Sequence, residues 1–193
     1  MPRNPPAPSR QRMLEAAIEL MRGYGLAGAG INDLVRESGA PKGSVYHFFP
    51  DGKTQIASEA LALYAGRVEQ FIESALAGRR EPQTKVRALF DAFAQRAAEG
   101  QFRRSCPVGT VSLDLGDDLE PVRTQLAAAV ARWTATIAAH FDLGSPQATR
   151  SFAGFVLSAI EGAYVRARAE HSSAAFKEAG VWLARLVSVP AKA

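Results

Sequence analysis

The sequence has little of several features that would assign it to a class at once. Its single cysteine, Cys106, excludes an intrachain disulfide framework and fits a reducing compartment. It has no uncharged apolar run near the roughly eighteen residues that a membrane helix needs, and its N-terminus is rich in proline where a secretory leader would be apolar. We therefore expect a cytoplasmic protein that makes no contact with a membrane.

The sequence also has only a small excess of positive over negative charge. The chain has 23 basic and 19 acidic residues, a formal net charge of +4, which is too small to identify a nucleic-acid-binding protein. A pI near 9.5 nevertheless favours a polyanionic partner. Hydrophobic residues make up 47% of the chain, enough for a packed core.

Patterns typical of catalysis or metal binding are missing. The histidines His47, His140 and His171 are scattered, and we find no His-x-x-x-His, Cys-x-x-Cys, phosphate-loop or nucleophile-elbow pattern. We therefore expect no enzymatic activity, no cofactor and no metal site.

Two features leave alternatives open. Cys106 beside Pro107 could be an activated thiol that acts as a redox switch, or a small buried hydrophobic residue. An acidic cluster could hold a hard cation or could cap helices, since a glycine turn and a proline helix start lie within it. The cluster consists of Asp114, Asp117, Asp118 and Glu120.

What is present is a pair of short helices predicted between Ile31 and Phe49. Ile31 and Leu34 lie at helical spacing, so the first helix has one apolar face. Gly39 can adopt the left-handed conformation that ends a helix, and Pro41 suits the first turn of the next helix. Two helices joined by a tight glycine-containing turn are typical of a helix-turn-helix that binds DNA.

The second helix of the pair has a polar outer face. Running from Pro41 or Lys42 to about Phe49, it spans roughly 12 Å, and a major groove is about 12 Å wide. Val45 and Phe48 are expected to face inward. Lys53, at the start of the next helix, is expected to contact a phosphate. The predicted DNA-contacting residues are Asn32, Lys42, Gly43, Ser44, Tyr46, His47 and Lys53.

The run from Gly39 to Phe49, followed by Lys53, resembles the TetR family of one-component bacterial repressors. The Asp51-Gly52 spacing and the segment Cys106-Pro107-Val108 resemble its LmrA/YxaF-like branch in particular. The resemblance implies an all-α homodimer. Three N-terminal helices would bind an operator, and a larger C-terminal domain would bind a small molecule that releases the DNA.

This chain departs from the family pattern at two positions. Many relatives have Ser or Thr ahead of each motif helix, where this chain has Ala29-Gly30 and Pro41. Hydroxyl capping and one or two hydroxyl contacts to phosphate are therefore expected to be absent.

Prolines and glycines at the ends of the periodic apolar segments predict nine helices, no strand and three regions. Residues 1–9 form a disordered tail, residues 10–52 the helix-turn-helix domain, and residues 53–193 the ligand-binding and dimerisation domain. Arg3 could reach a minor groove, or the tail could be untethered.

The middle helices are expected to form the ligand pocket, although each candidate could equally be ordinary core. The final two helices are rich in alanine and glycine, which allows close helix packing at a dimer interface or within one chain. The candidate ligand-binding residues are Tyr64, Phe90, Phe93, Cys106, Trp133 and Phe155.

The sequence therefore predicts a ligand-responsive transcriptional repressor. As a homodimer it would bind a near-palindromic operator, and a small, largely apolar or aromatic effector would release it. A constitutive DNA-binding protein without an inducer is one alternative. A small-molecule carrier or enzyme is another, but it would need clustered titratable groups that the sequence does not offer.

Overall fold

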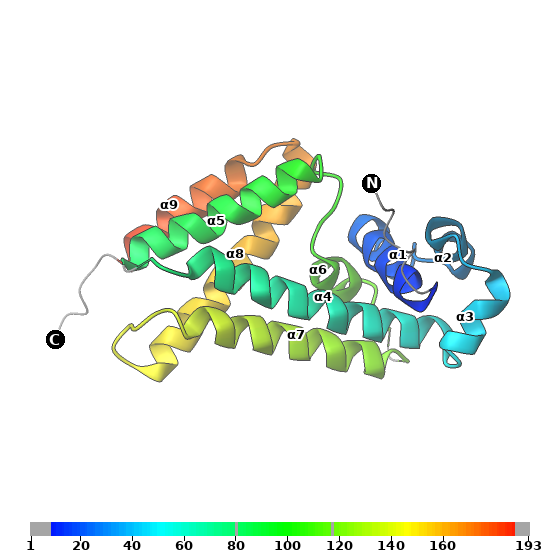
Figure 1. The fold of residues 1–193 in the computed structure, drawn as a ribbon. Helices are drawn as coiled ribbons and strands as arrows, with labels where there is room; N and C mark the ends of the chain where they lie inside the picture. Colours follow the sequence, from blue (N-terminus) through cyan, green and yellow to red (C-terminus); the bar gives the residue numbers. More distant parts are fainter. Residues whose placement is uncertain (1–8, 80, 117, 188–193) are drawn as a thin grey trace, which may run out of the picture. The chain divides into compact units, whose positions relative to one another are not determined.

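The computed structural model describes residues 9–79, 81–116 and 118–187. Within these ranges the chain forms nine α-helices and no strand, as predicted (Figure 1). The predicted tail, including Arg3, lies outside the described residues except for Ser9, which begins the first helix. The helices are α1 (Ser9–Tyr24), α2 (Ile31–Ser38), α3 (Lys42–Phe48), α4 (Gly52–Leu76), α5 (Pro82–Glu99), α6 (Pro107–Ser112), α7 (Glu120–Ala138), α8 (Pro146–Glu170) and α9 (Ala174–Leu186).

Local signals account for the helix boundaries. Pro82 and Pro146 occupy the first turns of α5 and α8, where a missing N–H costs nothing. The Ser145 hydroxyl accepts a hydrogen bond from the Ala148 N–H at 3.1 Å and so caps α8. Gly39 ends α2 in the left-handed region, with φ of 60°. No described helix combines the length and the hydropathy required to cross a membrane.

The described residues divide into two compact units. The first unit contains the residues up to Tyr64 together with Pro107–Ala127, and the second contains Ala65–Cys106 and the residues from Ala128 onward. Helix α6 and the start of α7 therefore belong to the same unit as α1–α3. The functional boundary expected after residue 52 stays a prediction.

In the first unit, α1 packs against α2, α3 and α6. The Thr110 hydroxyl of α6 donates to the Met21 carbonyl at 2.7 Å, and the Asp114 carboxylate accepts from the Ala27 N–H at 2.9 Å. Asp114 thus holds the turn after α1. Asp117 lies outside the described residues, and no group of three potential metal ligands occurs among the described ones.

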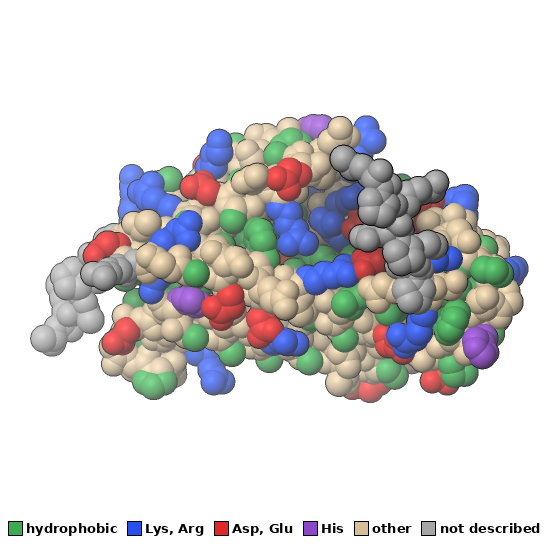
Figure 2. All heavy atoms as spheres, viewed as in Figure 1, with side chains coloured by type: hydrophobic (Ala, Val, Ile, Leu, Met, Phe, Trp, Pro, Cys, Tyr) green, Lys and Arg blue, Asp and Glu red, His purple; other side chains and the backbone are tan. Residues whose placement is uncertain are grey.

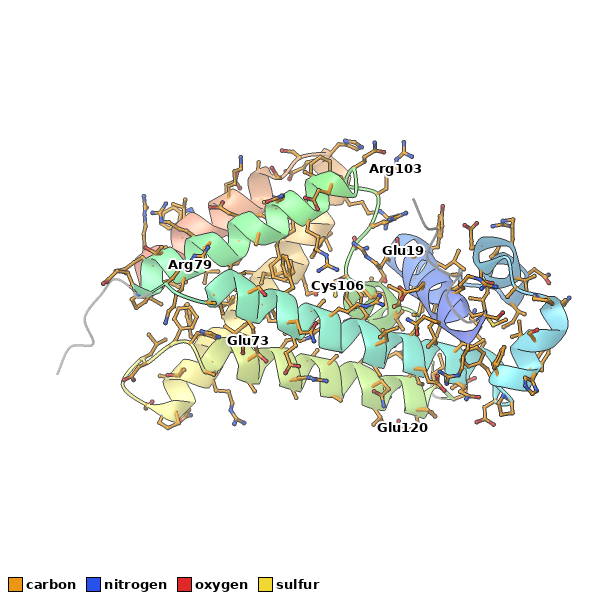
Figure 3. All side chains as sticks on the ribbon, in the orientation of Figure 1. Glu19, Glu73, Arg79, Arg103, Cys106 and Glu120 are labelled. Carbon is orange, nitrogen blue, oxygen red and sulfur yellow. The ribbon has the colours of Figure 1, made fainter. Side chains whose placement is uncertain are left out.

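In the second unit, α5 packs along α9, and α8 contacts both. The Trp133 indole N–H donates to the Ala65 carbonyl at 2.9 Å, which fixes α7 against α4. Glu69 pairs with Arg132, and His140 lies 2.8 Å from Glu73. Figure 3 labels Glu73 between α4 and α7. Figure 2 shows side chains of both charge signs interspersed over the surface of these two helices. The largest fully buried side chains of this unit are Ile72, Leu76, Leu89, Phe90, Trp133, Ile137, Ile160 and Phe176.

Close packing of α9 on α5 depends on Gly180. A methyl group at this position would lie 2.8 Å from the Phe90 Cβ, closer than such atoms approach in proteins. We therefore expect Gly180→Ala to lower the free energy of unfolding by about 1–2 kcal/mol, because overpacking outweighs the gain in helix propensity.

Gly66 in α4 provides the matched control, because no atom lies within 4 Å of the corresponding methyl position. Gly66→Ala should raise the free energy of unfolding by about 0.5–1 kcal/mol. Chemical denaturation of both variants measures the difference. Equal effects of the two substitutions would contradict close α5–α9 packing.

Candidate nucleic-acid interface

Helix α2 provides the first half of the helix-turn-helix. Gly30 precedes it in extended conformation, and no side chain caps the helix at this position. The Arg36 guanidinium bonds Asp33 at 2.7 Å, and this hydrogen bond is the main cause of a raised Arg36 pKa. Arg36 also pairs with Glu37, so two carboxylates already offset its charge and weaken it as a phosphate ligand. Asn32 is exposed on this helix, as a DNA contact requires.

The turn between α2 and α3 is held by buried groups. The Ser38 hydroxyl accepts from the Ala40 N–H at 3.3 Å, and both residues are buried. The Arg12 guanidinium of α1 donates to the Ser38 carbonyl at 3.1 Å. These contacts fix the direction in which α3 leaves the turn.

Helix α3 is anchored by its inner face. Val45, and Phe49 just beyond the helix, are fully buried. The Arg10 guanidinium lies 5.1 Å from the centre of the Phe49 ring and pairs with Glu59 of α4. Because the inner face is packed, the opposite face of α3 is the one available to a partner.

That outer face carries most of the predicted DNA-contacting residues. Lys42, Gly43, Tyr46 and His47 are exposed, and Ser44 is partly buried. In the described part of the chain, neither Lys42 nor Tyr46 has an ion pair or a side-chain hydrogen bond. A methyl group at Gly43 would meet open space, so the backbone here can come close to another molecule. One short helix thus presents an ammonium, a phenol and an imidazole together, which suits phosphates and base edges.

Lys53 lies in the first turn of α4. It is partly buried, its ammonium lies 3.5 Å from the Ala27 carbonyl, and its side chain lines a small apolar cavity in the first unit. Its role as a phosphate ligand stays a prediction.

The candidate ligand-binding residues fall in both units, and which of them contact a ligand stays a prediction. Phe90, Phe93, Cys106 and Trp133 are buried in the second unit, whereas Tyr64 is buried in the first, where the Arg22 guanidinium lies 5.9 Å from its ring centre. Phe155 is 55% exposed, so it is not part of the buried interior. Periodicity missed this because α8 has apolar residues on more than one face.

Sequence reasoning also missed Glu161 of α8. Its carboxyl group forms a hydrogen bond with Cys106, which Figure 3 shows just before α6. Burial raises the pKa of Glu161 to about 7, and the Cys106 hydrogen bond opposes this shift. No local pattern marks Glu161, because the partner approaches from a segment 55 residues away.

Comparison with protein families assigns both parts of the chain. Residues 13–60 match the N-terminal domain of the bacterial regulatory proteins of the tetR family. Residues 82–181 match the C-terminal domain of LmrA/YxaF-like transcriptional regulators.

Individual relatives agree with this assignment. The chain is 34% identical over 166 residues to an uncharacterized HTH-type transcriptional regulator of Mycobacterium tuberculosis, covering 82% of this chain and 84% of that protein. It is 32% identical over 130 residues to the uncharacterized HTH-type regulator YxaF of Bacillus subtilis, covering 67% and 68%.

Solved structures share the fold. A TetR regulatory protein from Rhodobacter sphaeroides superposes with a TM-score of 0.83 at 22% identity, over 92% of this chain and 97% of that one. The TetR family regulator CifR, solved as a cysteine mutant with 26-bp operator DNA, has a TM-score of 0.78 at 22% identity, over 95% and 98%. The chain described here therefore belongs to the TetR family of transcriptional regulators and carries a C-terminal domain of the LmrA/YxaF-like type.

Proposed function

We propose that this protein is a ligand-responsive transcriptional repressor that binds a near-palindromic operator as a homodimer. A small, largely apolar or aromatic effector would release it from the DNA. The observation that carries the proposal is the outer face of α3, where Lys42, Tyr46 and His47 are exposed while Val45 packs inward. The operator-bound structure of the similar protein CifR supports a DNA partner.

The test is protection mapping with the purified protein on genomic fragments, followed by salt titration on the protected site. Lys42→Ala should lower affinity by about 1–3 kcal/mol if Lys42 contacts a base edge. If Lys42 contacts a phosphate instead, Lys42→Ala should reduce the slope of log affinity against log salt concentration by about one. The affinity for all DNA sequences should then fall alike.

Arg87→Ala is the control, since Arg87 is an exposed cation on α5 in the second unit and its loss changes the net charge equally. If Lys42→Ala bound DNA as tightly as the wild type, or if Arg87→Ala lost as much affinity as Lys42→Ala, α3 would not be the surface that contacts DNA. Absence of any protected fragment would refute the proposed function itself.

An exposed apolar stripe on α8 and α9 supports the homodimer. Phe155, Gly162 and Val165 follow one another at helical spacing on α8 and are all exposed, with Val165 at 69%. On α9, Trp182 is 65% and Leu186 is 57% exposed. Large apolar side chains beside a glycine suit close packing against the same surface of a second copy.

Helix α6 is the element through which we propose that effector binding affects DNA binding. The chain passes from the second unit to the first between Cys106 and Pro107. Thr110 and Asp114 then bond the end of α1 and the turn that leads to α2. We infer that an effector that displaces Cys106 shifts this connection, and that DNA affinity falls by the difference in effector affinity between the two conformations.

A constitutive DNA-binding protein would share the α3 surface but have no effector. One measurement distinguishes the two proposals. Complexes of the protein with its protected DNA fragments are exposed to a collection of small molecules, and release of the DNA is measured. Release by any compound that binds the second unit supports the repressor.

A further inference from the structure

The last turn of α3 carries an aromatic side chain that the core does not fully enclose. The sequence predicts that Phe48 faces inward, but the structure leaves it partly exposed, and the neighbouring Phe49 is the fully buried ring. Phe48 follows Val45 by three residues, which places it about 60° round the helix from that buried side chain. It therefore lies on a flank between the inner and outer faces of α3, with apolar surface available to a partner.

A hydroxyl group lies on the same flank. Ser44 precedes Phe48 by four residues, a spacing that puts the two Cβ atoms about 5–6 Å apart. Ser44 is also partly exposed, and within the described ranges its hydroxyl has no hydrogen-bond partner. The His47 ring packs edge-on against Phe48, with 5.1 Å between ring centres, and restrains the phenyl ring. The flank thus offers a hydrogen-bonding group and an apolar ring side by side.

One DNA base presents the complementary pair of groups in the major groove. Thymine exposes the hydrogen-bond acceptor O4 and, next to it, an apolar 5-methyl group. A hydroxyl can donate to O4, and a phenyl ring is an apolar contact for the methyl group. Cytosine has an amino group in place of O4 and no methyl group. Because a hydroxyl both donates and accepts, Ser44 would suit either pyrimidine, and only the phenyl ring would discriminate between them.

We propose that Phe48 is a specificity-determining residue that contacts the 5-methyl group of a thymine in each operator half-site, while Ser44 donates to O4 of the same base. This inference rests on the proposed function, since it names a base that the α3 surface recognises. Tyr46 is two residues away from Phe48 and lies on the opposite flank of α3, so it does not contact this methyl group.

Replacement of thymine by deoxyuridine tests the contact, because it removes the 5-methyl group and leaves O4 in place. The DNA site protected by the wild type is resynthesised with each thymine replaced in turn, at equivalent positions of both half-sites. Affinity is measured by fluorescence anisotropy at one salt concentration. At one pair of positions the affinity of the wild type should fall about fourfold for each methyl group, or about 15-fold for the pair.

Variants then assign the methyl contact to one side chain. Phe48→Ala should bind the thymine site and the deoxyuridine site equally, and Phe48→Leu, which keeps an apolar contact, should retain part of the difference. Tyr46→Ala is the matched control, because Tyr46 is an exposed aromatic residue of the same helix. It should weaken binding to both sites by one factor and keep the full difference between them.

The wild-type measurement is decisive without any variant. Equal affinity of the wild type for all deoxyuridine sites would overturn the contact. A difference that persists in Phe48→Ala, or one that disappears in Tyr46→Ala, would overturn it as well. All three results leave operator binding itself intact. If no DNA fragment were protected, the proposed function would fail together with this inference, so the two failures are distinguishable.

Discussion

Trp182→Glu is expected to disrupt the proposed homodimer and to abolish tight operator binding. Trp182 is exposed on α9, and the Arg185 guanidinium lies 4.5 Å from its ring centre. Buried tryptophans are frequent energetic centres of interfaces, and a carboxylate in this place removes the apolar contact area and introduces a charge that is costly to desolvate. Loss of the second recognition helix should reduce operator affinity by about 100-fold or more, because the two half-sites are no longer bound by one molecule.

Sedimentation equilibrium and operator titration at equal protein concentrations measure both effects. Val130→Glu is the control, since Val130 is an exposed apolar residue of α7 outside the α8–α9 stripe, and it should leave both properties unchanged. If Trp182→Glu stayed dimeric with unaltered operator affinity, the interface would have to lie elsewhere.

Helix boundaries were predictable because their causes are local. Gly39 ends α2 and Pro82 and Pro146 start α5 and α8 through the backbone preferences of single residues. The exposed face of α3 was predictable for the same reason, since Val45 packs inward at the spacing that leaves Lys42 and Tyr46 outside. Neither inference needed a contact between distant segments.

Residues whose role depends on a distant segment were not predictable. Asp114 looked like part of a cap or a cation site, but its carboxylate bonds the Ala27 N–H, 87 positions away. Phe155 looked like pocket lining, because periodicity shows that a helix has an apolar face but not which of two apolar faces packs inward. Glu161 has no sequence signature, because its environment is created by Cys106 and by burial.

Glu161 should also make the stability of the protein depend on pH. Its pKa is about 7 in the folded protein and near 4.5 when unperturbed, so between these values the folded state keeps a proton that the unfolded state has released. Stability from this group is therefore fully present below pH 4.5, falls as the pH rises, and is lost above pH 7. The full shift corresponds to about 3 kcal/mol, and partial solvent access reduces the expected change to about 1–3 kcal/mol.

Glu161→Gln should remove this dependence, because an amide does not titrate. Compared with the wild type, we expect the variant to be about 1–3 kcal/mol more stable at pH 8 and nearly equal at pH 4.5. Urea denaturation at several pH values, with protein concentration held fixed, gives the two curves. The exposed Glu99→Gln variant should follow the wild-type curve. Parallel curves for the wild type and Glu161→Gln would mean that Glu161 releases its proton at the same pH in the folded and unfolded states. The Glu161 carboxylate would then already be well solvated in the folded protein.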